Sequence, residues 1–288
     1  MKYAFIRSQR CHHRLKLLCQ VLRVSRSGYY AWLNRGPSVR AQADQVLLQQ
    51  IQRVHDAHRG HSGALKTWRV LQRQGIAGGK HRVARLRRQQ GIVAKRRRRY
   101  IATTRSKYTT WQAPNLLRRN FTAQQPDRVW VGDVTHIPTR EGWLYLAVLI
   151  DLYSRQVVGW SMLKRNNTEL LLGALNMAIT QRRPQLGLIH HSDQGRTYAG
   201  KVYQQRLTDA DMKPSMSRKG DCWDNAVAES FFATLEFELI EQQVFRSRAV
   251  AKMAIFEFIE VFYNRQRSHQ TLAYKTPLMM EQEYRLVA

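Results

Sequence analysis

The sequence predicts an α/β protein in which an all-α region precedes a mixed sheet with flanking helices. Residues 1–120 contain 28 Lys and Arg but only two acids, whereas residues 121–288 contain 20 Lys and Arg and 18 acids. The first 100 residues show helical apolar spacing without strand alternation, and alternating Val-rich segments begin near residue 128. We expect the first part to bind a polyanion and the second to be an ordinary globular domain.

The composition excludes several classes of protein. Apolar residues make up 43% of the 288 residues, which permits a buried core. The longest apolar run, 143–150, is far shorter than the ~20 residues that span a bilayer, and the N-terminus lacks an apolar stretch of signal-peptide length. Three cysteines without a CxxC pair fit a reducing cytosol. With a net charge of +28, we expect a cytoplasmic, nucleoid-associated protein that binds nucleic acid and no membrane.

Residues 1–40 and 41–100 are predicted as two helical units. In the first, Leu15, Leu18 and Leu22 have helical spacing, VSRSG forms a turn, and YYAWL resumes a helix. The second unit contains three predicted helices, at 43–57, 64–73 and 80–90.

The second unit has the pattern of a helix-turn-helix DNA-binding domain. Leu65, Trp68 and Leu71 form one predicted buried stripe, and GIAGG separates this helix from the next. In the last helix Val83 and Leu86 face inward, and the outside is lined by Lys80, Arg82, Arg85, Arg87 and Arg88. Two short helices around a Gly-containing turn, the second one cationic, are typical of a recognition helix. A basic helix that binds phosphates without reading sequence is the alternative.

Further polar side chains of this unit are expected in solvent. Its end carries five adjacent cations: Lys95, Arg96, Arg97, Arg98 and Arg99. Because they cannot all enter a core or a groove, we expect a basic strap that attracts phosphates. His55, His58 and His61 are expected to be solvated or to contact phosphate. Residues 101–126, with two prolines and little periodicity, are predicted as a linker.

Residues 127–288 are predicted as the α/β domain. Strands at 128–138, 143–153 and 155–163, joined by short turns, imply an antiparallel meander. The remaining predicted elements are a helix at 168–182, a strand at 186–193, and helices at 199–210, 224–241 and 249–263. This order predicts a mixed sheet with helices on its faces. Trp130, Trp143 and Trp160 are expected in the core because they lie on strands.

Three acids stand in segments that are otherwise apolar. Asp133 lies within the first strand, Asp193 ends the fourth, and Glu229 lies in a helix after 35 intervening residues. A buried carboxylate requires a cation, hydrogen bonds or a metal. Separate stabilisation of each acid at strand ends and caps is the alternative to one joint site.

The segments around these acids resemble a known family. In order along residues 128–278, the matching segments are VWVGDVTHI, GWLYLAVLIDLYSRQVVGW, HSDQG, SMSRKGDCWDNAVAESFFATL and FYNRQRSHQTLAYKTP. They are similar to the OrfB-type (second reading frame) transposases of bacterial insertion sequences, a DDE family with a retroviral-integrase-like catalytic core. The resemblance implies a ribonuclease-H-like fold and two divalent metal ions, Mg²⁺ with Mn²⁺ as a substitute, held by Asp133, Asp193 and Glu229.

Carboxylates suit this chemistry on physical grounds. Phosphodiester cleavage needs an activated oxygen nucleophile and relief of charge on the leaving oxygen, and two hard cations ~4 Å apart supply both. Water as the nucleophile frees a 3′-hydroxyl, which attacks a second phosphodiester at the same metals. We therefore expect a DNA transposase that cleaves insertion-sequence ends and joins them to other DNA. A catalytically inactive DNA-binding inhibitor of transposition, or a metal-dependent nuclease without joining activity, is the alternative.

Residues near the predicted site receive supporting roles. His191 shares the strand face of the second Asp, and Asn225 matches a family motif position, so both are predicted as active-site support. A packed core histidine is the alternative for His191. The family commonly has a cation seven residues after the Glu, where this chain has Glu236. Arg218 and Lys219 are candidates to bind DNA in its place.

The expected partner is double-stranded DNA, as terminal inverted repeats and as target. Because two DNA ends must be brought together, we expect a homodimer or a larger synaptic assembly. The product of an upstream reading frame is a further candidate partner that the resemblance implies.

Overall fold

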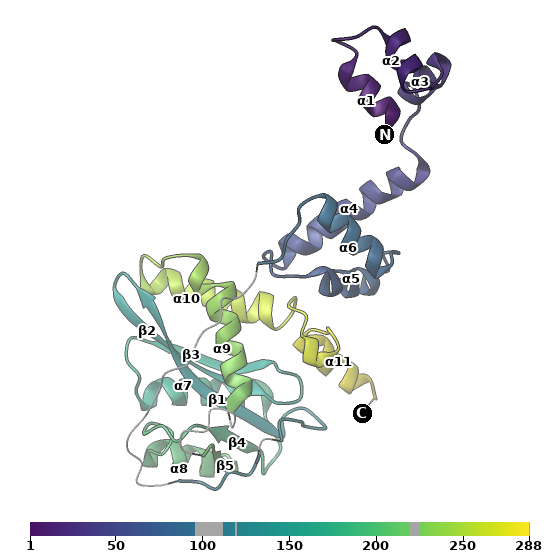
Figure 1. Cartoon of the computed structure of the whole chain (residues 1–288). Helices are drawn as coiled ribbons and strands as arrows, with labels where there is room; N and C mark the ends of the chain where they lie inside the picture. Colours follow the sequence, from purple (N-terminus) through teal and green to yellow (C-terminus); the bar gives the residue numbers. More distant parts are fainter. Residues whose placement is uncertain (96–111, 119, 219–224, 288) are drawn as a thin grey trace. The chain divides into compact units, whose positions relative to one another are not determined.

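The computed structural model describes residues 1–95, 112–118, 120–218 and 225–287. The chain divides into two compact units, Met1–Ile51 and Gln52–Ala288 (Figure 1). The described residues do not include the start of the predicted linker. They also do not include five predicted DNA-binding cations, which are Arg96, Arg97, Arg98, Arg99 and Lys219. Within the described part of the chain, the helices are all too short or too polar to cross a membrane.

Three short helices form the core of the first unit: α1 (Lys2–Gln9), α2 (Leu15–Val21) and α3 (Arg26–Leu33). α4 (Val39–Ala57) follows them. The side chains buried among the short helices are Ile6, Leu18, Cys19 and Tyr29. Ser25 begins α3 as an N-cap, because its hydroxyl accepts a hydrogen bond from the Gly28 N–H at 3.0 Å. The two predicted helices are thus confirmed, but the turn lies earlier than predicted, because Arg26, Ser27 and Gly28 already belong to α3.

Helices α5 (Ala64–Arg73) and α6 (Lys80–Gln89) end within one residue of the predicted positions. They bury Leu71, Val83 and Leu86. The predicted stripe is wrong at Leu65, which is exposed, while Thr67 is fully buried. Residues three apart drift around a helix that repeats every 3.6 residues. The inward face is therefore the one shared by Thr67 and Leu71.

A five-stranded sheet forms the centre of the second unit, in the order β3-β2-β1-β4-β5. Its strands are β1 (Val129–Thr139), β2 (Gly142–Asp151), β3 (Val157–Leu163), β4 (Ile189–Ser192) and β5 (Lys213–Met216). The first three strands form the predicted antiparallel meander, and β4 and β5 join it in parallel. Sequence patterns do not indicate β5, since it has four residues, includes Pro214 and lies at the sheet edge.

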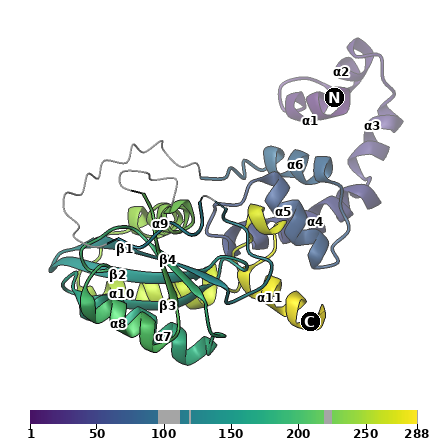
Figure 2. The same cartoon turned by 90° about the horizontal axis from the view of Figure 1, so that it is seen from below.

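Helices cover both faces of this sheet. α7 (Thr168–Arg182) and α8 (Lys201–Asp209) pack on one face, and α9 (Ala226–Glu238) and α10 (Arg248–Phe256) pack on the other. In Figure 2, α7 and α9 lie on opposite sides of the strands. The approach of α7 to β3 is close, because a Cβ added at Gly159 would lie 2.3 Å from the Ala174 carbonyl oxygen. The predicted mixed sheet with flanking helices is confirmed.

The three strand tryptophans differ in environment. Trp130 is fully buried, and Trp160 is half-buried with its indole N–H donating to Glu260 at 2.7 Å. The prediction of a core position is wrong for Trp143, which is 50% exposed. It stands at the start of β2, beside the hairpin turn, where its ring packs edge-on against His136 with centroids 4.6 Å apart.

The chain after α9 continues with helical segments. These are short 3₁₀ turns at Ile240–Gln242 and Gln270–Leu272, a π-helical continuation of α10 at Glu257–Tyr263, and α11 (Pro277–Val287). Asn264 then clamps the start of β3. Its Nδ2 donates to the Val157 carbonyl, and its Oδ1 accepts from the Val157 N–H, both at 3.0 Å. A side-chain amide therefore pairs with the strand as a neighbouring backbone would.

Candidate active site

Asp133 lies in the middle of β1, opposite Val148 of β2. Because side chains alternate along a strand, it shares a face with Val131 and Ile137, which pack in the layer of α9 and α10. The Val134 N–H donates to Asp133 Oδ1 at 2.8 Å, and the side chain is half-buried. β1 thus presents this carboxylate on the face of the sheet that α9 covers.

The other two acids come from a strand end and a helix start. Asp193 directly follows β4, which pairs in parallel with β1. The Gly195 N–H donates to Asp193 Oδ1 at 2.9 Å, and a Cβ at Gly195 would lie 2.8 Å from that oxygen. The turn that orients Asp193 therefore favours glycine. Glu229 lies in the first turn of α9, where the helix dipole favours a carboxylate.

Asp133 is within electrostatic reach of the other two acids. The pKa of Asp133 is raised to about 8, first by burial and then by the charges of Asp193 and Glu229, against the lowering effect of the Val134 N–H. Desolvation also raises the pKa of Asp193 and of Glu229, although both side chains remain in contact with solvent. Ionising all three carboxylates together is therefore unfavourable unless a cation joins them.

The donor chemistry of this group suits a hard divalent cation. Carboxylate oxygens are the ligands that Mg²⁺ prefers, and a bound cation would reverse the repulsion that raises the pKa of Asp133. Within the described ranges, however, no three His, Cys, Asp or Glu side chains are arranged closely enough to hold a metal ion. The roles of Asp133, Asp193 and Glu229 as ligands stay predictions.

Tyr198 is a site residue that the sequence patterns do not indicate. It is buried, and its hydroxyl oxygen would lie 3.3 Å from a Cβ added at Gly132, the neighbour of Asp133. Burial raises the pKa of Tyr198, and the charges of Asp133 and Asp193 raise it further. A tight turn, in which the Tyr198 N–H donates to the Gly195 carbonyl at 3.0 Å, returns the chain so that the side chain packs in the layer of α7 and α8. Sequence spacing alone does not reveal that return.

Two predicted supporting residues are buried. His191 is fully buried and its Nδ1 hydrogen-bonds with the Ser215 hydroxyl at 2.8 Å, as the packed-histidine alternative expects. Asn225 is the buried N-cap residue of α9. Its Oδ1 has no hydrogen-bond partner among the described atoms. A supporting role in the active site stays a prediction for both His191 and Asn225.

A groove of about 930 Å³ is lined by residues of β1 and α9, and none of the three acids is among them. Thr135, two residues after Asp133 on the same strand face, lines it, and so does Glu236, two helical turns after Glu229. Arg140 and Glu241 also line the groove. Glu229 does not line this groove, so a DNA channel shared by Glu229 and Glu236 stays a prediction.

The predicted outward cations of α6 divide into three groups. Lys80 and Arg88 are exposed, whereas Arg82 and Arg85 are half-buried. The prediction is wrong for Arg87, which is buried and donates to the Thr67 hydroxyl at 3.0 Å and to the Ser62 carbonyl at 2.8 Å. Two polar groups inside the domain draw this guanidinium inward, which helical periodicity cannot indicate.

The remaining predicted DNA contacts lie on loops. Lys95 is exposed, and its ammonium donates to Gln242 Oε1 at 2.8 Å. Arg218 is exposed next to residues outside the described ranges. Contacts of Lys95 and Arg218 with DNA stay predictions.

The histidines at the end of α4 are not solvated as expected. His58 is buried, its Nδ1 lies 2.9 Å from the Val54 carbonyl, and burial lowers its pKa. The ring of His61 packs edge-on against Phe237 of α9, with centroids 4.7 Å apart. The turn after α4 is covered by the end of α9, so these rings serve packing.

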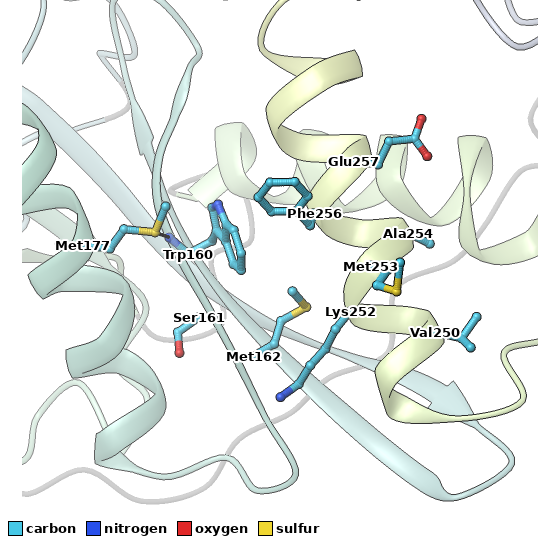
Figure 3. Close-up of a pocket in the computed structure, with 10 residues that line it drawn as sticks. All are labelled: Trp160, Ser161, Met162, Met177, Val250, Lys252, Met253, Ala254, Phe256 and Glu257. Atoms are coloured by element: carbon cyan, nitrogen blue, oxygen red, sulfur yellow. Dashed lines mark hydrogen bonds between the residues drawn. The ribbon is translucent and has the colours of Figure 1, made fainter.

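A second groove, of about 980 Å³, lies between β3 and α10 (Figure 3). Its lining is mostly apolar, with Met162 on the strand and Met253 and Phe256 on the helix. Glu257 at this groove forms an ion pair with Arg59 at 2.9 Å. Because two strands separate β3 from β4 and one separates it from β1, this groove is not continuous with the three acids.

Family models match most of the chain. Two models described as "Integrase core domain" match residues 123–222 and 210–277. A model described as "HTH-like domain" matches residues 42–100.

Curated relatives match over nearly their whole lengths. Transposase InsF for insertion sequence IS3A of Escherichia coli (strain K12) is 38% identical over 287 residues, 98% of each chain. The transposase for insertion sequence element IS904 of Lactococcus lactis is 41% identical over 245 residues, 85% of this chain and 97% of that one. The insertion element IS600 uncharacterized 31 kDa protein of Shigella sonnei is 42% identical over 271 residues, 94% of this chain and 100% of that one.

Solved structures match more distantly. The HTLV-2 integrase catalytic core domain in complex with magnesium is 19% identical, with a TM-score of 0.41, over 55% of this chain and 98% of that one. A chain of a simian T-cell lymphotropic virus intasome is 17% identical, with a TM-score of 0.47, over 61% of this chain and 60% of that one.

Proposed function

Because the chain belongs to the insertion-sequence transposases with an integrase core domain, we propose that it cleaves the DNA ends of its element and joins the freed 3′-hydroxyl to a second phosphodiester. The observation that carries this proposal is that carboxylates at the end of β4 and on α9 act electrostatically on the carboxylate of β1. A carboxylate whose ionisation is opposed by burial and by neighbouring acids suits a reaction in which positive charge is brought to it.

Each part of the site has a role in this reaction. Asp133, Asp193 and Glu229 would hold divalent cations, which when bound neutralise phosphate charge and activate an attacking oxygen. Asp133 is held in β1 by its pairing with β2, and the Gly195 N–H orients Asp193. Tyr198 packs against the neighbouring Gly132 from the opposite face of the sheet.

DNA is held by the helical region in this proposal. The helix-turn-helix-like domain positions the terminal repeat through the exposed Lys80 and Arg88 of α6, with the strap after Lys95 adding phosphate contacts. Residues 41–100 act as the end-binding domain, 101–126 as a linker and 127–288 as the catalytic domain. Two DNA ends require at least two copies of the chain.

Strand transfer by the full-length protein tests the proposal. A labelled duplex with the element's terminal sequence is incubated with plasmid DNA and Mg²⁺ or Mn²⁺. Asp133→Asn, Asp193→Asn and Glu229→Gln should each abolish cleavage and joining but leave DNA binding intact, because each removes a ligand charge and little volume. Glu169→Gln is a matched control, since Glu169 lies in the first turn of α7 as Glu229 lies in the first turn of α9.

Three results would contradict parts of the proposal. Cleavage without joining indicates a nuclease, and DNA binding without cleavage indicates an inactive inhibitor. A variant of one acid that keeps normal cleavage removes that acid from the site. Independently of activity, Mn²⁺ should raise the unfolding temperature of the wild type and of Glu169→Gln more than that of the three acid variants.

A further inference from the structure

The first unit contains a tight connection between two helices. α2 ends at Val21 and α3 begins at Arg26, so four residues join them. Arg23 in this turn has a φ of 53°, a left-handed conformation in a position where such turns often contain glycine. The Val24 N–H donates to the Cys19 carbonyl at 3.0 Å, which closes the end of α2. Two short helices around a turn of this length are the geometry of a helix-turn-helix.

We propose that α2 and α3 form a second DNA-reading module, in which α3 enters the major groove of double-stranded DNA. This inference rests on the proposed function, because it presumes a chain that acts on DNA. The matched helix-turn-helix-like domain begins at residue 42 and the integrase core at residue 123, so neither includes these helices.

The third helix of the unit holds α3 by one face. Tyr3 of α1 packs against Trp32 of α3 with ring centroids 5.9 Å apart, and Tyr29 is fully buried beside them. A Cβ added at Gly28 would lie 2.5 Å from the Tyr3 hydroxyl oxygen. α1 therefore rests on α3 at a glycine, and this close contact fixes the orientation of the opposite face of α3.

That opposite face has the chemistry of a recognition helix. At 100° per residue, Arg26, Ser27, Tyr30 and Ala31 lie within an arc of about 140°, away from Tyr29. All four are exposed. Arginine reads guanine through two hydrogen bonds, serine accepts or donates to any base, and an alanine methyl contacts the thymine methyl.

Charge favours DNA over a protein partner. Residues 1–40 contain nine Lys and Arg and no Asp or Glu. A surface of this kind attracts the phosphate backbone without local repulsion, so it supplies affinity while α3 supplies sequence preference. Exposed Leu17 and Val21 of α2 offer the competing interpretation, an apolar surface that docks a protein.

Selection from a random duplex library by the full-length protein tests this proposal. We expect the wild type to select a motif in which one block of bases depends on Arg26. Arg26→Ala should lose the preference within that block, by about 5- to 150-fold in relative affinity, and keep the rest of the motif. Arg26→Lys should do the same although it keeps the charge, because lysine lacks the two-pronged geometry of arginine.

Controls separate this inference from folding and from the proposed function. Arg7→Ala, an exposed cation of α1, should weaken binding to all sequences alike and leave the motif unchanged. Selection of an unchanged motif by both Arg26 variants would overturn the second module while leaving the proposed function intact. A change of assembly state in Leu17→Ser with no change of motif in Arg26→Ala would also overturn it, in favour of protein docking. A wild type that selects no DNA would overturn the proposed function itself.

Discussion

The acids of the sheet and the cations of α6 are charged groups held in opposite ways. Asp133 is fixed in a strand with neighbours on both sides, and burial and the charges of Asp193 and Glu229 oppose its ionisation. Lys80 and Arg88 project from a helix into solvent. Salt screens charges of this exposed kind, whereas it screens buried groups much less.

The difference separates two tasks of charge. Under the proposed function, the charge that must act at one point lies on a paired strand, although its ionisation is unfavourable there. The charges that have only to attract phosphate are exposed, where neighbouring cations can replace them. Arg87 lies on the same helix as Lys80 and Arg88 but belongs with the first kind, because it is buried and hydrogen-bonded.

The largest expected effect concerns the pH dependence of stability at Asp133. The pKa of Asp133 is about 8 in the folded protein, against an ordinary value of 3.8 for an aspartate in the unfolded chain. The unfolded chain therefore releases this proton first as the pH rises. The metal-free protein should therefore lose stability from pH 4 to 8, by up to about 5 kcal/mol. Thermal unfolding with a chelator at several pH values measures this loss.

Asp133→Asn should remove this part of the pH dependence, because the amide does not ionise. Buried His190, whose pKa burial lowers to about 3, has the opposite sign and loses stability as the pH falls below 6.5. The difference between wild type and Asp133→Asn isolates the acid from such groups. Equal pH profiles for the two proteins would show that the sheet does not oppose ionisation of Asp133, and the comparison with α6 would fail.

A medium effect is expected from a matched pair of substitutions on α6. Arg87→Met should cost about 1–3 kcal/mol of stability, because the Thr67 hydroxyl and the Ser62 carbonyl lose their donor. Arg88→Met should change stability by less than about 0.5 kcal/mol. It should reduce the salt dependence of DNA binding by about 0.9 for one lost phosphate contact. Urea unfolding and a salt series of DNA affinities measure the two effects, and the reverse pattern would place Arg87 outside the core.

The smallest effect is expected at Glu236. This acid lines the groove along β1 and α9, so it would repel a phosphate backbone lying there. Glu236→Lys should tighten binding of terminal DNA and steepen its salt dependence by about one phosphate contact, ~0.9. Glu169→Lys makes the same charge change on α7, on the other face of the sheet, and serves as the control. Equal gains in both variants would mean that Glu236 has no special place in the groove.

Elements with marked ends could be predicted from the sequence almost residue by residue. α7 runs over the predicted 168–182, since Asn167 caps its start and Arg183 ends it in a left-handed conformation. The meander follows from long Val-rich strands between short turns. β5 could not be predicted, because a strand of four residues shows too little periodicity and its position is set by pairing with β4.

The sequence singles out the acids of the candidate site, but it does not indicate the buried residues that the structure adds. Asp133 and Glu229 stand out because carboxylates are rare in apolar segments. Tyr198 and Arg87 do not, because each owes its position to partners distant in sequence: Tyr198 to the strand that carries Gly132, and Arg87 to Ser62 and Thr67. The residue pattern of a single helix or loop does not indicate partners that lie far away in the sequence.

The clamp that Asn264 forms on Val157 bears on how this protein avoids self-association. β3 is an edge of the sheet, and an open edge can add a strand from another molecule. At Val157 both backbone groups are already bonded to the Asn264 amide, and at Trp160 the N–H donates to the Met177 sulfur at 3.4 Å. Two side chains thus occupy hydrogen-bonding positions that an incoming strand would need, which hinders fibril-like growth from this edge at Val157 and Trp160.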